Sequence, residues 1–241
     1  MFLPNARPSW KLALIGLLFY FGLAYAAPFF GSPDELDEDH QIKPAITKTQ
    51  AAEAALAFAA DQFKLTSPGP ANVVFQSHTD RSGYLQKEKL MAEYNKRFAE
   101  RYPIDYYEVE FADGPSTYYI DIDFKNKTIL GYSAYRSPAA RSETVSSGEK
   151  SAPAAVAQAA VRRMGYDPAQ FTAAAQDEDR PTKRFVFASS NEKIGDTRLE
   201  LHVEVPGGEA VSFRSVFPPP ASFLAWRDAQ DDKSSEMTRI S

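Results

Sequence analysis

Acidic residues that could do chemistry alternate with apolar residues in two segments near the middle of the chain. Glu108 and Glu110 share one face of a predicted strand. Asp121 and Asp123 share one face of the next, because successive side chains in a strand point to opposite faces. Paired carboxylates perform acid–base catalysis where their environments separate their pKa values, and an acidic strip also binds a cation or a basic peptide. Carboxylates that alternate with core residues are equally the ordinary solvated face of an antiparallel sheet, so we assign no catalytic residue.

Tyrosines accompany these carboxylates on the same predicted polar face. Tyr106 and Tyr119 lie in the two strands, and Tyr135 lies in the strand that follows. Tyrosine combines apolar area with a hydroxyl group and is enriched in recognition surfaces, although aromatic residues also favour strands for packing reasons. We therefore expect a face that binds a protein or peptide partner, made of Tyr106, Glu108, Tyr119, Asp121 and Asp123.

The composition and the missing motifs argue against thiol chemistry, metal binding, known nucleophile motifs and nucleic-acid binding. The chain of 241 residues has no cysteine, which removes disulfides, thiolate metal sites and thiol nucleophiles. His40, His78 and His202 are far apart in the sequence and form no HExxH pattern, so we expect no metal site and no other cofactor. Neither a GxSxG nucleophile motif nor a P-loop occurs. A net charge of −5 without a dense basic patch argues against a nucleic-acid partner.

The first thirty residues predict a membrane anchor. Arg7 and Lys11 precede an uncharged apolar run that approaches the roughly 20 helical residues needed to span a bilayer, and acidic residues follow it. This charge order places the N-terminus inside the cell and the bulk of the chain outside the cytoplasm, as a single-pass membrane protein. The alternative is secretion after cleavage near Ala26, because Ala24-Tyr25-Ala26 resembles a signal-peptidase site. The apolar side chains of the predicted anchor are Leu12, Leu14, Ile15, Leu17, Leu18, Phe19, Phe21 and Leu23.

Beyond an acidic linker, one order of elements occurs twice. Alanine-rich helices are predicted to begin after Thr47 and Ser151, whose hydroxyl groups suit the capping position. An amphipathic helix is predicted over 83–102, and a polar turn at Lys125-Asn126-Lys127 joins two strands. Alternating or β-rich segments cover 71–78, 104–111, 116–136, 182–189 and 196–217. The predicted fold class is α+β, with two units that each consist of an antiparallel sheet with helices packed on one face.

The order of elements and the segment YYEVEFADGPSTYYIDIDFKNKTILGY resemble PepSY-type domains, small extracytoplasmic modules also found near the propeptides of secreted metallopeptidases. The resemblance covers Thr47 to Arg136 and, more weakly, Ser151 to Phe217. It departs from the family at the turn, where Lys125-Asn126-Lys127 replaces the usual Thr-Gly. The resemblance implies tandem PepSY-like domains in this chain.

The larger arrangement is similar to the N-terminal ectodomain of some bacterial CPBP (CAAX protease and bacteriocin-processing) membrane proteins. In those proteins an anchor helix and paired modules precede a multi-helix membrane protease. Phe223, Leu224 and Trp226 begin a predicted helix in the tail, which suggests a return toward the membrane. The EExxxR motif of such proteases is missing from this chain, so the resemblance implies that any protease activity lies beyond Ser241.

The sequence therefore predicts a membrane-anchored extracytoplasmic binding or regulatory module that has no catalytic activity of its own. Its expected partners are the membrane and a protein or peptide, which could be a membrane protease domain. The alternative is the ectodomain of a CPBP-type intramembrane metalloprotease, and the DNA beyond the codon for Ser241 would distinguish the two. The predicted segments are an anchor at 1–30, a linker at 31–46, domains at 47–136 and 151–217 joined by a linker at 137–150, and a juxtamembrane-like end at 218–241.

Overall fold

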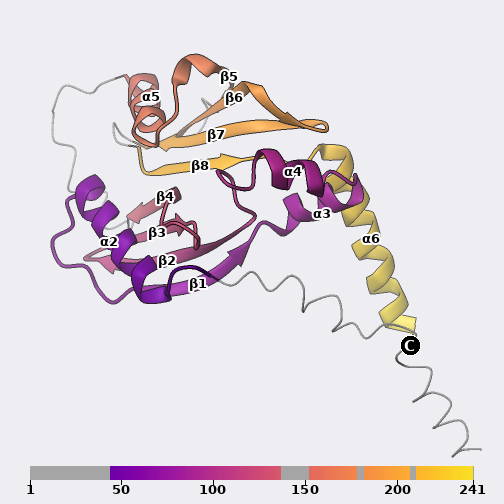
Figure 1. The fold of residues 1–241 in the computed structure, drawn as a ribbon, viewed down its shortest axis with the longest axis horizontal. Helices are drawn as coiled ribbons and strands as arrows, with labels where there is room; N and C mark the ends of the chain where they lie inside the picture. Colours follow the sequence, from indigo (N-terminus) through magenta and orange to yellow (C-terminus); the bar gives the residue numbers. More distant parts are fainter. Residues whose placement is uncertain (1–43, 137–151, 178–181, 207–209, 241) are drawn as a thin grey trace, which may run out of the picture. The chain divides into compact units, whose positions relative to one another are not determined.

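Eight antiparallel strands form one sheet in the computed structural model, which describes residues 44–136, 152–177, 182–206 and 210–240 (Figure 1). The strand order is β1-β2-β3-β4-β8-β7-β6-β5. The strands are β1 (Asn72–Ser77), β2 (Asp105–Asp113), β3 (Ser116–Ile122), β4 (Ile129–Arg136), β5 (Phe171–Asp177), β6 (Lys183–Ile194), β7 (Thr197–Val205) and β8 (Ser212–Val216). The chain from Ala45 onward forms one compact unit by its contacts.

Five α-helices and one short 3₁₀ helix accompany the sheet in the described part of the chain. They are α2 (Lys48–Phe63), α3 (Thr79–Lys87), α4 (Met91–Arg97), α5 (Pro153–Arg163), η5 (Pro168–Gln170) and α6 (Ala221–Ile240). The α+β class is confirmed. None of the helices in the described ranges is both long and apolar enough to cross a bilayer. The predicted anchor, the linker at 137–150 and the expected cap Ser151 lie outside the described residues.

The sequence explains where α2 begins and ends. The Thr47 side chain accepts a hydrogen bond from the Gln50 amide (3.2 Å), and the Gln50 side chain accepts one from the Thr47 amide (2.9 Å), which forms a capping box. The helix ends at Lys64, whose left-handed backbone (φ 53°) breaks the α-helical path. Ala51, Ala55 and Ala59 recur every four residues and are fully buried, so their small side chains let α2 lie close to the sheet.

The single amphipathic helix predicted over 83–102 is wrong, because the segment forms two short helices. Lys89 adopts a left-handed backbone (φ 59°) between α3 and α4 and turns the chain there. The Leu90 amide then donates to the Leu85 carbonyl at 2.7 Å and closes the turn. Tyr94 and Phe98, which the periodicity placed on the apolar face, are buried as expected.

The prediction that each unit has a sheet of its own is also wrong. The first half supplies β1 to β4 and the second half supplies β5 to β8, and the two halves join where β4 pairs with β8. In this seam, Tyr132 lies opposite Phe213, and their rings stack with centroids 6.3 Å apart. The two halves of the described chain therefore share one sheet and one hydrophobic core.

The helices α2 and α5 pack against the face of the sheet whose side chains are apolar. Phe58 and Phe63 of α2 contact Tyr132, with ring centroids 5.6 Å apart in both pairs. Ala157 and Val161 of α5 are fully buried in the same core. Because side chains alternate along each strand, polar residues are left on the opposite face of the sheet.

Two tyrosines of the first half, one in α3 and one after the end of α4, also hold the hairpin between β6 and β7. The hydroxyl oxygen of Tyr84 in α3 accepts a hydrogen bond from the Asp196 amide at 2.9 Å. The Tyr102 hydroxyl donates to the Glu192 carboxylate at 3.0 Å. These bonds join residues about a hundred positions apart, so the second half depends on the first for the shape of its hairpin.

Replacing Gly195 in this hairpin with alanine is expected to destabilise the protein by about 2 kcal/mol. Gly195 has a φ of 53°, and an added Cβ would lie 2.5 Å from the Tyr84 hydroxyl and 2.6 Å from Leu90 Cδ1. Urea unfolding of the two proteins measures the change. Gly165→Ala is the matched control, because Gly165 also has a positive φ (81°) but an added Cβ there meets no atom within 4 Å. An equal loss of stability in both variants would show that backbone strain alone, and not the contact with Tyr84 and Leu90, causes the destabilisation.

Candidate functional site

A row of polar side chains crosses the face of the sheet opposite α2. The strand registers place Glu108 of β2 beside Asp121 of β3, Asp121 beside Gly131 of β4, and Gly131 beside Arg214 of β8. His202 of β7 lies beside Arg214 and continues the row into the second half. Two carboxylates, a glycine, a guanidinium and an imidazole thus follow one another across five strands.

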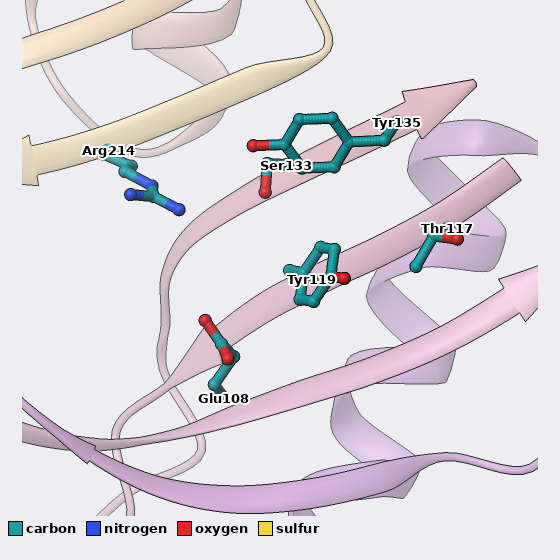
Figure 2. A pocket seen from close by; sticks show the side chains of 6 residues that line it. All are labelled: Glu108, Thr117, Tyr119, Ser133, Tyr135 and Arg214. Atoms are coloured by element: carbon teal, nitrogen blue, oxygen red, sulfur yellow. The ribbon is translucent and has the colours of Figure 1, made fainter. Parts of the chain in front are cut away.

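A hollow of about 420 Å³ lies on this face (Figure 2). Four strands line it through Glu108, Thr117, Tyr119, Ser133, Tyr135 and Arg214. In Figure 2 the Arg214 guanidinium reaches inward from β8, and the Glu108 carboxylate points into the same space from the other side. Tyr135 is 55% exposed at the wall, so the hollow can receive a ligand from solvent. We call these six residues the polar hollow.

Gly131 keeps the centre of the row open. An added Cβ there would lie 2.9 Å from the Phe213 carbonyl oxygen, 3.2 Å from Asp121 Oδ2 and 3.6 Å from Arg214 Cγ. Any larger residue would therefore fill the space between the Asp121 carboxyl and the base of the Arg214 side chain. Because Gly131 has no side chain, no side chain of β4 lies at this point of the row between Asp121 of β3 and Arg214 of β8.

Burial raises the pKa of Asp121 to about 6. The Arg214 guanidinium opposes this shift, and the neighbouring Glu108 carboxylate adds to it. The Asp121 carboxyl consequently changes charge close to neutral pH. Asp121 is not one of the six residues that line the hollow, but it lies next to Glu108, which does. Carboxyl groups with such a pKa are typical of functional sites, although structural clusters also produce such shifts.

Tyr106 and His78 form an apolar contact at the side of the row, with ring centroids 4.8 Å apart. Burial, followed by the charges of Asp121 and Glu108, raises the pKa of Tyr106 to about 12. Burial, followed by the charges of Arg81 and Arg214, lowers the pKa of His78 to about 3. Both rings are therefore neutral at pH 7, and the charge in this part of the face comes from the carboxylates and guanidinium groups.

The second half of the polar face is internally paired. Arg184 Nη2 lies 2.6 Å from His202 Nδ1, and His202 Nε2 lies 2.8 Å from a Glu200 carboxylate oxygen. Since a guanidinium can only donate, Nδ1 must accept and Nε2 must carry the proton that Glu200 accepts. His202 is thus half-buried within a hydrogen-bonded chain of side chains.

The structure brings together four of the five residues predicted for the partner-binding face. Tyr106, Glu108, Tyr119 and Asp121 share the polar face through the pairing of β2 with β3. Asp123 lies elsewhere, because β3 ends at Ile122 and the Asp123 side chain is buried in the following turn, where it accepts a hydrogen bond from the Lys125 amide at 2.9 Å. The short Asp123 side chain accepts a hydrogen bond from the backbone of its own turn, so it does not lie on the polar face of the strands.

Sequence reasoning missed Arg214, Ser133 and Thr117. Arg214 alternates with Phe213 and Ser215, which marks it as a polar-face residue of its own strand. Only the pairing of β4 with β8 places it near Asp121, and no pattern within either repeat predicts that pairing.

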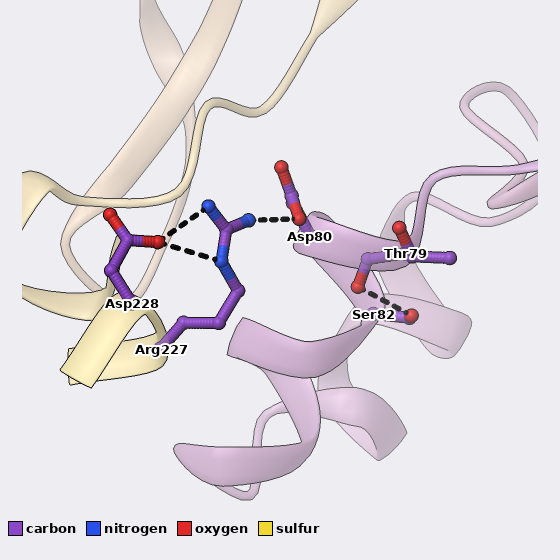
Figure 3. A network of polar contacts seen from close by, with 5 residues as sticks. All are labelled: Thr79, Asp80, Ser82, Arg227 and Asp228. Atoms are coloured by element: carbon purple, nitrogen blue, oxygen red, sulfur yellow. Dashed lines mark hydrogen bonds and ion pairs between the residues drawn. The ribbon is translucent and has the colours of Figure 1, made fainter. Parts of the chain in front are cut away.

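A second hollow, of about 570 Å³, lies between α3 and the start of α6. Phe223 of α6 is buried against Tyr84, and Arg227 forms ion pairs with Asp80 and Asp228 (Figure 3). Trp226 stays 44% exposed beneath the Lys87 ammonium, which lies 5.1 Å from the ring centroid. These contacts fasten the beginning of α6 to α3, and we assign this region a structural role.

Among the residues that the structure describes, no three histidine or acidic side chains lie close enough together to hold a metal ion. No protein-family model matches the chain. No curated protein matches it either. Among solved structures, the Bacillus megaterium YpeB C-terminal domain is similar to it at 12% sequence identity with a TM-score of 0.39. The match covers 71% of this chain and 64% of that structure, so the chain spans less than two thirds of its length.

Proposed function

We propose that this chain is a membrane-anchored extracytoplasmic module, built of two PepSY-like halves, that binds a protein or peptide partner on its polar sheet face. The polar hollow is the observation that carries the proposal. It offers tyrosine rings, hydroxyl groups and charges of both signs on a face that neither α2 nor α5 covers. The chain does not catalyse a reaction itself but regulates or recruits its partner, which could be a membrane protease domain.

The architecture suits binding. Most of the hollow residues project from strands whose backbones are fixed by ladder pairing on both sides, so their side chains are positioned before a partner arrives. Tyr119 and Tyr135 contact each other edge to face, with centroids 5.8 Å apart, and form an aromatic wall. Rigid aromatic side chains beside exposed charges are typical of surfaces that recognise peptides.

Photocrosslinking of the full chain in its own cells tests the proposal. With p-benzoylphenylalanine at Tyr135, we expect one defined protein adduct, and the same group at Gln158, on the exposed side of α5, gives none. Because Arg214 is exposed, Arg214→Glu should leave folding intact and reduce the adduct at least about fivefold. Adducts of equal yield at Tyr135 and Gln158, or none at either, would contradict a partner on this face.

A further inference from the structure

The charged groups around the polar hollow lack the partners that such groups normally have. Among the described residues, Arg214 at the hollow and Asp121 beside Glu108 have no side-chain hydrogen bond and no ion pair, although the Arg214 charge still lowers the pKa of Asp121. Glu108 receives one long hydrogen bond, from Gln76 Nε2 at 3.4 Å. In the same sheet, His202 joins Arg184 and Glu200 through contacts of 2.6 and 2.8 Å, although the buried Arg184 Nε has no hydrogen-bond partner. The charged side chains at the polar hollow therefore make fewer direct contacts with other charged side chains than those of the neighbouring cluster do.

The unsatisfied charges are also separated by sign. Glu108 and Asp121 are cross-strand neighbours and form the anionic side. Arg214 is two strands beyond Asp121, on the far side of Gly131, and forms the cationic side. Gly131 leaves open floor between the two sides, because it carries no side chain to bridge them. In Figure 2, the Arg214 guanidinium and the Glu108 carboxylate lie on opposite sides of the hollow.

We propose that the polar hollow and the neighbouring Asp121 bind an extended peptide segment that carries a lysine or arginine and an acidic residue two positions apart. The basic side chain lies on Glu108 and Asp121, and the acidic one lies on Arg214. This inference rests on the proposed function and names the chemistry of the partner.

The spacing follows from strand geometry. Side chains at i and i+2 of an extended chain point the same way and lie roughly 7 Å apart, whereas those at i and i+1 point to opposite sides. Adjacent strands of the sheet are about 4.8 Å apart, so Asp121 and Arg214 start roughly 10 Å apart at the backbone, and the long Arg214 side chain shortens that distance over Gly131. A planar guanidinium binds a carboxylate through two parallel hydrogen bonds, which gives the cationic side its preference for an acidic residue.

Two peptides of identical composition test the spacing. Fluorescein-labelled Ser-Lys-Val-Asp-Val-amide carries its charges at i and i+2, and Ser-Val-Lys-Asp-Val-amide carries them at i and i+1. Fluorescence anisotropy with the full chain in detergent micelles should give about tenfold tighter binding of the first peptide. Replacing its lysine by norleucine, or its aspartate by asparagine, should each cost a similar factor.

Variants of the protein complete the test. Glu108→Gln and Arg214→Gln should each weaken the first peptide about tenfold and leave the second unchanged. Glu53→Gln removes the same charge from the exposed side of α2 and should change neither affinity. Equal affinity for the two peptides, or no binding of either up to roughly 5 mM, would overturn the inference. Adducts at Tyr135 would still uphold the proposed function in that case, so the two failures are distinguishable.

Discussion

Replacing Phe213 with alanine should destabilise the protein by about 3–5 kcal/mol and unfold both halves in one transition. Phe213 is fully buried in β8, where its ring lies 6.3 Å from that of Tyr132 and 5.7 Å from that of Tyr166. Tyr132 belongs to the first half and Tyr166 to the second. The truncation therefore opens a cavity at the seam, where neither half can repack it alone.

Urea unfolding, followed together with hydrogen exchange of the β2 and β7 amides, measures this effect. Protection of both strands should fall by the same amount in Phe213→Ala. Phe75→Ala is the control, since Phe75 is 46% exposed at the edge of the sheet and its loss should cost less than about 1.5 kcal/mol. If β7 loses protection while β2 keeps it, the sheet does not unfold as one cooperative unit.

Replacing Asp121 with asparagine should stabilise the protein by about 2–3 kcal/mol at pH 8 and by much less at pH 4. The native pKa is raised to about 6 from an ordinary value of 3.8, so the folded protein holds this proton to a higher pH than the unfolded chain does. The free energy of unfolding of the wild type accordingly falls as the pH rises from about 4 through about 6. Asparagine is uncharged throughout and abolishes that part of the slope.

The groups around Asp121 determine how far its pKa is raised. Burial is the largest cause, the Arg214 guanidinium on β8 lowers the pKa, and the Glu108 carboxylate on β2 raises it further. The Tyr106 hydroxyl on β2 also interacts with the Asp121 carboxyl. Chemical denaturation at several pH values gives the difference between Asp121→Asn and wild type. Asp61→Asn, an exposed position on α2, should show no such pH-dependent difference. A gain of equal size at pH 4 and pH 8 would exclude a raised pKa as its cause.

The effect of Asp121 ties stability to the proposed binding site. A carboxylate that weakens the fold when ionised, beside a guanidinium that it does not pair with, is an arrangement that stability alone does not favour. A bound basic side chain would supply the missing counter-charge to Asp121 and Glu108.

The sequence predicted which face of a strand is buried better than it predicted which strands pair with each other. Strict alternation at Val109, Ile120, Leu201 and Val203 identified residues that are all fully buried. The same alternation placed Glu108 and Asp121 on the polar face. The pairing of β4 with β8 was not predictable, because side-chain alternation is identical for a strand at an edge and a strand at the centre of a sheet.

The sequence did not predict three local features: the strand β5, the break between two helices at Lys89, and the position of the Asp123 side chain. Strand β5 has the sequence FTAAAQD, in which three alanines give no alternation and little β preference. The break at Lys89 has no glycine or proline to mark it. Asp123 continued the alternation of its strand by one step, but its carboxylate accepts a hydrogen bond from the Lys125 backbone instead.

The pairing of β4 with β8 cannot form until synthesis of the chain is almost finished. Each of the two strands is the last of its half, so β4 is complete long before Ser212 to Val216 are synthesised. During that interval β4 presents unpaired backbone groups and Tyr132 lacks its stacking partner, which are the features that promote pairing between nascent chains. A chain halted before Ser212 would keep that unpaired edge permanently, and residues 44–136 expressed alone should self-associate for the same reason.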